Sequence, residues 1–356
     1  MKKPIVIILW TLCAVMILSA PLLFSSPNLL GEVKWELMDG AEDEDDEDSD
    51  LEEGLLRLFV STARAEEELI IEETTEEEGP FGEAVYTLPV DFSVAPAPNL
   101  AGYTENGYED ETIRVVMEDR EEEGVIWHLA FVEIASPTQL RTATAVPGKL
   151  TSTRTATVSG MAKYNNAVVA INGDNFVDKP EKTTFEYRQG EKIRNKGNRT
   201  KDVLIIDANG DFHIFPASAA NSRDEHTAAL RKAAEEWGMV QAFTFGPVLV
   251  MDGQVCTVDS EYGYNPNGKE PRAALGQLGK LSYVLAIAEG RGESAGVTHQ
   301  QLADFMGSLG CTQAFNLDGG NSAEMVFGEK IYKGMPGGAE RGLSDIIYFA
   351  TAVPAE

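Results

Sequence analysis

The sequence predicts an α+β domain built on a mixed, largely antiparallel sheet. Two hairpin signals and the placement of the helices support this class. Asn209-Gly210 and Asp252-Gly253 each lie between two short apolar segments, and both dipeptides are typical of type I′ hairpin turns. The predicted helices fall between groups of strands instead of following each strand, which favours α+β over a doubly wound parallel sheet.

Strands are predicted from apolar segments bounded by turn residues. The folded part is expected to begin near residue 110, with two strands joined by an acidic turn. The predicted strands span residues 112–118, 125–134, 166–171, 203–206, 212–215, 248–251, 254–258, 281–288 and 344–350.

Three helices with packed faces complete the predicted domain, at residues 153–164, 224–237 and 298–309. Gly238 and Gly310 are expected to end the second and third, because glycine adopts the left-handed conformation common after a helix. Thr298 and Gln301 have the spacing of a capping box at the start of the third.

The charge of the chain limits its partners. The 356 residues carry a formal net charge of −29, and much of it lies between residues 32 and 78. Nucleic-acid backbones select basic surfaces, so a nucleic-acid partner is not expected. The almost purely acidic stretch 43–50 cannot pack into a core, and residues 27–109 are predicted to form an acidic, mostly disordered linker.

The N-terminus predicts a membrane anchor or a signal peptide in residues 1–26. Two lysines precede an apolar run from Ile5 to Phe24, which is long enough to cross a bilayer, since a span takes about 20 residues. The lysines predict a cytoplasmic N-terminus and an extracellular domain on a single-pass anchor. Pro21 disfavours cleavage; with cleavage the protein would be secreted.

The segment from Phe315 to Ser322 is the strongest candidate for a binding site. An apolar strand ends at Asp318, and Gly319 and Gly320 follow. Glycine permits positive φ and close approach of the backbone to a ligand. A carboxylate beside exposed backbone N–H groups suits a polar, anionic substrate. A tight turn after a buried strand is the alternative interpretation.

Two further segments carry polar residues at strand ends. Asn172, Gly173 and Asp174 follow the apolar segment 166–171; the alternative is a turn in which the side chains bond their own backbone. Arg272 stands alone among small and apolar residues, so it requires a carboxylate partner or an anionic ligand. A structural salt bridge is the simpler explanation for this arginine.

A glycine-rich loop with Glu289 and Arg291 leads from a predicted strand into the helix at 298. Such a loop can hold an anion, and arginine adds a bidentate donor. The alternative is a flexible loop with a surface arginine. No pair of histidines or cysteines has metal-ligand spacing, and no nucleophile elbow or P-loop occurs, so neither a metal nor a cofactor is predicted.

The order of these motifs resembles the phosphodiester glycosidase family. Residues 170–176, 245–250, 271–276 and 316–322 follow one another as in that family, and the resemblance covers residues 110–352. The family includes the mannose 6-phosphate uncovering enzyme and exported bacterial proteins associated with exopolysaccharide.

Three residues depart from the family pattern. Asn321 stands where the family usually has a third glycine, and Ala323 where it has a second serine. Asparagine tolerates left-handed backbone better than other non-glycine residues, so the turn is expected to form. Asn175 stands where the family usually has an aromatic residue. These departures bear on the substrate more than on the fold.

The resemblance implies a hydrolase that cleaves the sugar–phosphate C–O bond of a sugar-1-phosphodiester. The sugar would be N-acetylglucosamine-like, in cell-envelope or exopolysaccharide metabolism. A phosphate ester leaves as a stable anion, so it requires positive charge and donors more than a proton. Asp318 is the first candidate for the catalytic carboxylate, followed by Asp174 and Glu289. Substrate contacts are assigned to Asn172, Gly173, Arg272, Arg291, Asn316, Gly319, Gly320 and Ser322.

Two other functions are consistent with these residues. A non-catalytic glycan-binding module of the envelope is the main alternative, because Asn321 and Ala323 depart from the family pattern. A phosphodiesterase that cuts the P–O bond is the third hypothesis. The sequence leaves the oligomeric state open.

Overall fold

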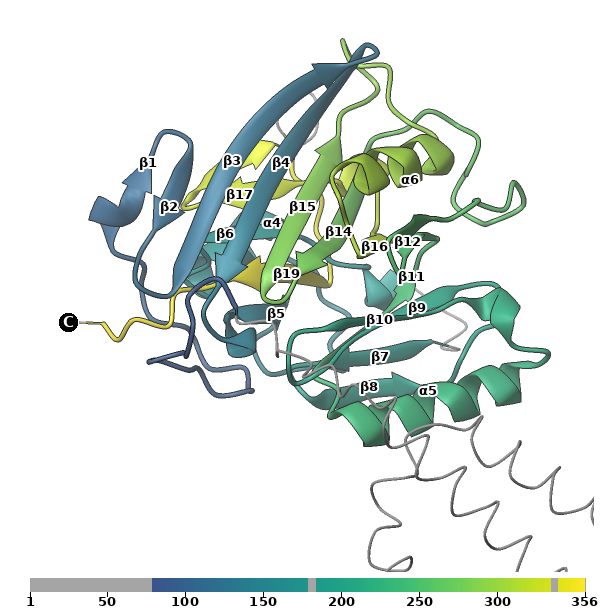
Figure 1. Cartoon of the computed structure of the whole chain (residues 1–356), viewed down its shortest axis with the longest axis horizontal. Helices are drawn as coiled ribbons and strands as arrows, with labels where there is room; N and C mark the ends of the chain where they lie inside the picture. The colour runs from purple at the N-terminus through teal and green to yellow at the C-terminus, as the bar shows by residue number, and fades with distance from the viewer. Residues whose placement is uncertain (1–78, 179–183, 334–338, 356) are drawn as a thin grey trace, which may run out of the picture. The chain divides into compact units, whose positions relative to one another are not determined.

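Nineteen strands form three antiparallel sheets in the described part of the chain, residues 79–178, 184–333 and 339–355 of the computed structural model (Figure 1). These residues form one mostly β domain with three α-helices. The predicted membrane segment 1–26 and most of the predicted acidic linker lie outside the described residues. Within the described residues no helix combines the length and apolarity needed to cross a membrane.

The largest sheet has nine strands, whose bounds and spatial order are as follows. The order is β1 (Tyr103–Thr104), β2 (Gly107–Glu109), β3 (Ile113–Glu122), β4 (Val125–Ile134), β15 (Ser282–Ala288), β14 (Arg272–Gly279), β16 (Gln313–Asn316), β12 (Val248–Met251) and β13 (Gln254–Val255).

The two smaller sheets have five strands each. One has the order β10 (Phe212–Phe215), β9 (Asp202–Ile206), β11 (Gln241–Phe245), β7 (Phe185–Arg188) and β8 (Glu191–Asn195). The other has the order β18 (Lys330–Lys333), β17 (Met325–Phe327), β6 (Val169–Asn172), β19 (Asp345–Phe349) and β5 (Leu140–Thr144). Consecutive strands are often far apart in the sheets, so the fold depends on long-range pairing.

Apolar side chains of all three sheets meet in one core. Val115 and Leu285 come from the nine-stranded sheet, Leu204 from the second, and Ile171 and Ile347 from the third. Buried and exposed residues alternate along the strands, because successive side chains point to opposite faces of the sheet. In β3 this gives buried positions at every second residue of its first half.

Each helix covers the outer face of one sheet. Helix α6 (His299–Ser308) packs on the nine-stranded sheet, α5 (Arg223–Trp237) on the sheet that contains β9, and α4 (Val158–Tyr164) on the sheet that contains β6. Figure 1 shows α5 and α6 on separate sheets. The predicted capping box at Thr298 is present, and Gly238 ends α5 in the left-handed conformation with φ 66°.

The two predicted hairpins form with different turns. Asp252 and Gly253 both have positive φ, 50° and 73°, as the predicted type I′ turn requires. At the other hairpin only Gly210 has positive φ. There the Asp207 carboxylate accepts hydrogen bonds from the backbone N–H groups of Asn209 and Asp211, at 2.8 and 3.0 Å. A side chain therefore closes a wider loop than the predicted two-residue turn.

The fold begins earlier in the chain than the predicted boundary near residue 110. Strands β1 and β2 extend the nine-stranded sheet, and Ala95 packs into the core beside α4. The buried Arg141 guanidinium donates hydrogen bonds to the carbonyls of Pro89, Asp91 and Ser93, at 2.8, 2.9 and 3.1 Å. Carbonyl groups of the proline-containing segment thus satisfy an arginine that lies about 50 residues away.

Helix α4 begins at Val158, five residues after the predicted start at 153. The Thr157 hydroxyl accepts a hydrogen bond from the backbone N–H of Gly160, at 3.1 Å. This contact is an N-cap, which satisfies a backbone donor that has no partner inside the helix. Because the helix begins after this cap, residues 153–157 of the predicted helix lie outside it.

Candidate active site

The loop after β16 is the point at which the separate motifs of the sequence meet. The Asp318 N–H faces the Gly173 carbonyl at 3.4 Å, and the Asp318 carbonyl accepts a hydrogen bond from Asn172 Nδ2 at 2.7 Å. On the next turn, the Gly320 N–H donates to the Pro271 carbonyl at 2.8 Å. Three segments that lie about 50 to 100 residues apart are therefore joined by backbone contacts.

Arg291 contacts the same turn from the glycine-rich loop. Its Nη1 donates a hydrogen bond to Oδ1 of Asn321, and its Nε donates to Oε2 of Glu270 at 2.7 Å. A Cβ built on Gly320, which has a φ of 59°, would lie 3.3 Å from Arg291 Nη2. The Arg291 side chain is 45% exposed. Glycine at 320 thus lets a solvent-accessible guanidinium approach the turn.

A second arginine, Arg341, contacts the turn at the following residue. Its Nη1 donates a hydrogen bond to the Ser322 hydroxyl at 2.8 Å and lies 3.8 Å from Oδ2 of Asp318. The side chain of Arg341 is 44% exposed and that of Asp318 is 18% exposed. Ser322 and Asp318 therefore share one cationic neighbour, which the sequence motifs did not include.

A pair of carboxyl groups lies next to this turn. Burial raises the pKa of Glu324 to about 8, and a hydrogen bond to Glu340 and the charge of Glu340 act in the same direction. Glu340 accepts hydrogen bonds from the N–H and the hydroxyl of Ser159, at 3.1 and 2.7 Å. Burial opposes ionisation of Glu340, but the hydrogen bonds from Glu324 and Ser159 hold its pKa below the usual range. Glu324 is thus the protonated member of the pair at neutral pH.

Glu289 belongs to a polar cluster at the end of β15. Its Oε1 lies 2.7 Å from His128 Nε2 and forms an ion pair with Lys333. His128 Nδ1 lies 2.7 Å from Asp119 Oδ1, which also accepts a hydrogen bond from the Tyr332 hydroxyl at 3.0 Å. Burial alone would raise the pKa of Glu289, but hydrogen bonds from Lys333 and His128 lower it. Glu289 is therefore ionised.

Asp174 lies beneath the site in a buried ion-pair network. Its Oδ1 pairs with Arg188 Nη2 at 2.8 Å, and its Oδ2 accepts a hydrogen bond from the Thr244 N–H at 3.1 Å. Arg188 also pairs with Asp345 at 2.8 Å, and all three charged side chains are fully buried. A Cβ on Gly173 would collide with the Asp345 carboxylate. The small residue at 173 lets the strand end lie directly on this network.

Arg272 is buried and hydrogen-bonded to backbone carbonyls. Its guanidinium donates to the carbonyls of Tyr264, Asn265 and Gly268, at 3.0, 2.7 and 3.1 Å, and to that of Val297 at 3.3 Å. Burial lowers its pKa to about 10. The sequence suggested a carboxylate or an anionic ligand as its partner. Loop carbonyls fill that role in the structure.

The two predicted amide ligands are also buried. Asn172 Nδ2 donates to the carbonyls of Gly173 and Asp318, and its Oδ1 accepts from the Glu324 N–H at 3.2 Å. Asn316 Nδ2 donates to the Gly246 carbonyl at 2.8 Å, while its Oδ1 has no hydrogen-bond partner within the described part of the chain. These amides hold the loop in place.

The family of the chain follows from a comparison with known proteins. A family model described as phosphodiester glycosidase matches residues 165–350, more than half of the chain. The chain belongs to the phosphodiester glycosidase family. The matched region contains every residue that the sequence singled out for catalysis or substrate binding, and it also contains Glu324, Glu340 and Arg341.

Two relatives illustrate the range of the similarity. The catalytic domain of zebrafish N-acetylglucosamine-1-phosphodiester α-N-acetylglucosaminidase, auto-inhibited by its pro-peptide, superposes with a TM-score of 0.52 at 18% identity, over 72% of this chain and 87% of that chain. This likeness shows a shared fold. The SPbeta prophage-derived uncharacterized protein YomE of Bacillus subtilis is 26% identical over 200 residues, 55% of this chain. The chain spans 30% of the length of that curated relative.

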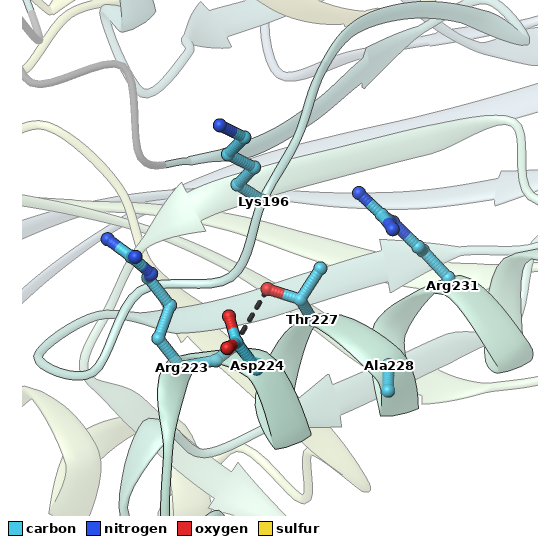
Figure 2. A pocket seen from close by; sticks show the side chains of 6 residues that line it. All are labelled: Lys196, Arg223, Asp224, Thr227, Ala228 and Arg231. Atoms are coloured by element: carbon cyan, nitrogen blue, oxygen red, sulfur yellow. Dashed lines mark hydrogen bonds between the residues drawn. The ribbon is translucent and has the colours of Figure 1, made fainter.

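A basic pocket lies on α5 (Figure 2) and includes none of the residues of the four sequence motifs. Lys196, Arg223 and Arg231 surround Thr227, whose hydroxyl donates to the Arg223 carbonyl at 2.7 Å. The pocket has a volume of about 280 Å³ and one acidic lining residue, Asp224. None of the predicted site residues lines it.

In the described residues no group of three or more histidine, cysteine, aspartate or glutamate side chains is placed to hold a metal.

Glu324, Glu340 and Arg341 are the site residues that the sequence motifs missed. Glu324 could have been noticed, because it is a carboxylate directly before the apolar strand β17. Glu340 and Arg341 lie in a polar segment before β19 with no distinguishing pattern. The pairing of β19 with β6 and with β5 positions that segment beside the turn.

Proposed function

We propose that this domain hydrolyses the C–O bond between the anomeric carbon of a sugar and a phosphodiester. One observation carries the proposal. Two partly exposed guanidinium groups, Arg291 and Arg341, bond to adjacent residues of the turn that also presents Asp318. Guanidinium groups bind phosphate oxygens through paired N–H donors. This arrangement suits a phosphate that departs as an anion.

The leaving group determines what the site must supply. An ordinary glycoside needs an acid to protonate the departing oxygen, whereas a phosphate ester leaves as a stable anion. Arg291 and Arg341 would bind it and stabilise the charge that develops on its oxygens. Both side chains contact the turn, so their positive charges lie beside the site before the substrate binds.

Asp318 is assigned to the anomeric carbon. It is partly exposed and lies beside Arg341, which is expected to contact the phosphate. A carboxylate at this position can stabilise an oxocarbenium-like centre, attack it or activate water. Glu289 is the second candidate, since it is ionised and lies two residues from Arg291.

The protonated state of Glu324 limits the negative charge around the turn. Asp318 and Glu340 already contribute two carboxylates there. A third ionised carboxylate would repel the substrate phosphate. A neutral Glu324 therefore keeps the two arginines available to an anion at neutral pH.

Asn172, Asp174 and Arg272 are assigned to positioning instead of direct contact with substrate. Their side chains are buried, and their polar atoms bond to the loop or to the ion-pair network. Of the other predicted contacts, Gly319, Gly320 and Ser322 lie on the turn itself. Their backbone would approach the phosphate.

The setting of the reaction is part of the proposal. We expect an N-acetylglucosamine-like sugar-phosphate or glycan substrate of the cell envelope or an exopolysaccharide, and an extracellular domain held at the membrane. The support is the family membership and the apolar run at residues 5–24.

A direct test is hydrolysis of N-acetylglucosamine-1-(methyl phosphate) in water labelled with ¹⁸O. The expected products are labelled sugar and unlabelled methyl phosphate. Label in the phosphate would instead indicate P–O cleavage. The Asp318→Asn variant is the control for contaminating activity. The proposal is wrong if the folded protein releases no sugar from this or related diesters.

A glycan-binding module remains the second candidate because of one contact. Asn321, which stands where the family usually has glycine, accepts a hydrogen bond from Arg291. That bond occupies a donor that a phosphate would otherwise use. Glycan binding without turnover in the same assay would favour the module.

A further inference from the structure

A groove of about 760 Å³ lies between the N-terminal segment of the domain and the β17–β18 hairpin. Such a volume is in the range of ligand-binding pockets, about 300–1,000 Å³. Leu100, Tyr103, Phe327, Ile331 and Tyr332 supply its apolar and aromatic surface. None of the residues assigned to the reaction lines the groove, so its surface has no role in the chemistry proposed above.

The β17–β18 hairpin connects the groove to the site. Strand β17 begins at Met325, immediately after Glu324, and ends at Phe327 in the wall of the groove. Strand β18 runs back, so that Lys333 pairs with Met325. Lys333 in turn forms the ion pair with Glu289. One end of the hairpin therefore lies at the carboxylates and the other end lines the groove.

A series of aromatic rings follows the same course. The centroids of Tyr103 and Phe327 lie 5.3 Å apart, and those of Phe327 and Tyr332 lie 6.5 Å apart, both edge to face. The ring of Tyr332 then lies 5.9 Å from that of His128, which bonds to Glu289. The rings thus extend from the groove to the polar cluster at the end of β15.

The lining combines flat apolar surfaces with polar groups. Thr104, Lys163 and Asn166 lie among the aromatic and aliphatic residues. The Tyr103 hydroxyl is buried and has no hydrogen-bond partner among the described residues. A sugar ring has an apolar C–H face that can stack on an aromatic ring and hydroxyls that can bond to a polar rim. A hydrocarbon chain would leave the buried Tyr103 hydroxyl without a hydrogen-bond partner.

We propose that this groove binds sugar residues of the chain that carries the scissile phosphodiester, so that the substrate is a polymeric or oligomeric glycan. The inference rests on the proposed function for the identity of the reaction. It does not depend on that function for binding, because neutral sugar units alone should occupy the groove. The groove would then raise the affinity for long substrates without taking part in bond cleavage.

The test is calorimetric titration of the full chain with three neutral hexasaccharides, made of N-acetylglucosamine, glucose or galactose. We expect at least one to bind, and Tyr103→Ala to weaken that binding about tenfold, a loss of about 1.4 kcal/mol. Tyr164→Ala is the matched control, because Tyr164 lies on α4, is 55% exposed and does not line the groove.

A second variant guards against unfolding of Tyr103→Ala, since Tyr103 also packs on Tyr108. Ile331→Asp changes a side chain that is 43% exposed and should weaken hexasaccharide binding without loss of fold. Tyr103→Phe removes only the hydroxyl and should have a smaller effect. Circular dichroism melting curves would confirm that each variant is folded.

The outcomes separate this inference from the proposed function. If none of the three hexasaccharides binds to wild type, or if the groove variants bind as wild type does, the inference is overturned. Binding of vesicles that contain polyprenyl phosphate at the groove, with no binding of sugar, overturns it as well. If hexasaccharides bind through the groove but no sugar-1-phosphodiester is hydrolysed, the function fails and the groove inference stands.

Discussion

Nη1 of Arg341 donates a hydrogen bond of 2.8 Å to the hydroxyl of Ser322. The contact joins a segment just before the last strand to the turn that follows β16. The adjacent residue of the same turn, Asn321, accepts a hydrogen bond from Arg291. A glycine-rich turn is therefore held between two guanidinium groups, and the predictions below concern what this arrangement does.

Asp318→Asn should reduce turnover of a sugar-1-phosphodiester by about 10²–10³-fold or more, because the carboxylate acts on charge that develops in the transition state. The melting temperature should change little, since the side chain lies at the site and not in the core. Steady-state kinetics and thermal melting test both statements. Asp224→Asn, on the exposed start of α5, is the control. Near-normal hydrolysis by Asp318→Asn would remove Asp318 from the reaction.

Arg341→Lys should raise KM for the phosphodiester about tenfold and also lower kcat, because lysine keeps the charge but loses the planar pair of donors. Arg154→Lys, a change at an exposed arginine, should leave both constants unchanged. Inhibition by inorganic phosphate provides a second measurement. If Arg341→Lys binds phosphate as tightly as wild type, this arginine does not contact the leaving group.

Arg272→Lys should destabilise the fold, by about 1–3 kcal/mol in the free energy of unfolding, because the buried guanidinium and the partly buried loop carbonyls that it bonds would lose hydrogen bonds. Loss of activity would then follow from loss of loop structure. Urea denaturation monitored by fluorescence measures the change. If the variant is as stable as wild type but loses most of its activity, Arg272 contacts the substrate directly.

The stability of the domain should fall as pH rises from about 4.5 to about 8 through the ionisation of Glu324. Its pKa is raised from 4.5 to about 8 in the folded protein, so the native state binds the proton more tightly than the unfolded state does. The contribution is complete below the unfolded pKa and is lost as pH rises through the folded pKa.

Hydrolysis should decline over the upper part of this range, because ionised Glu324 adds negative charge beside the phosphate site. Glu324→Gln cannot ionise, so this variant should retain activity at pH 9. Melting curves and initial rates from pH 5 to 9 test the prediction. If Glu324→Gln is inactive at every pH while folded, Glu324 is instead a proton donor in the reaction.

Asn321→Gly should increase affinity for inorganic phosphate a few-fold, on the order of 0.5–1.5 kcal/mol, because it frees the Arg291 donor that now bonds to the amide. Titration calorimetry with phosphate measures this directly. Asn267→Gly, an exposed asparagine on a loop outside the turn, is the matched control. Weaker binding in Asn321→Gly would show that the amide orients Arg291 for the anion.

Local signals in the sequence were sufficient to predict several caps and turns. The capping box at Thr298, the left-handed glycine at 238 and the Asp252-Gly253 turn depend on neighbouring residues, and all three are present. The turn at Asn209-Gly210 was predicted less well, because the Asp207 side chain competes for its backbone donors.

The amino-acid order alone predicted antiparallel strand pairing with packed helices, since periodicity, turn residues and glycine patterns act over short distances, and it singled out the segment around Asp318 as the candidate site. The predicted α+β class understated the strands, because the described residues form a mostly β domain with three α-helices. The tertiary structure decided which charged groups face solvent. It buried Asp174 and Arg272 and brought Arg341 and Glu340 to the turn. Pairing between strands far apart in the chain sets burial and charge partners, and such long-range contacts leave no local pattern in a single sequence.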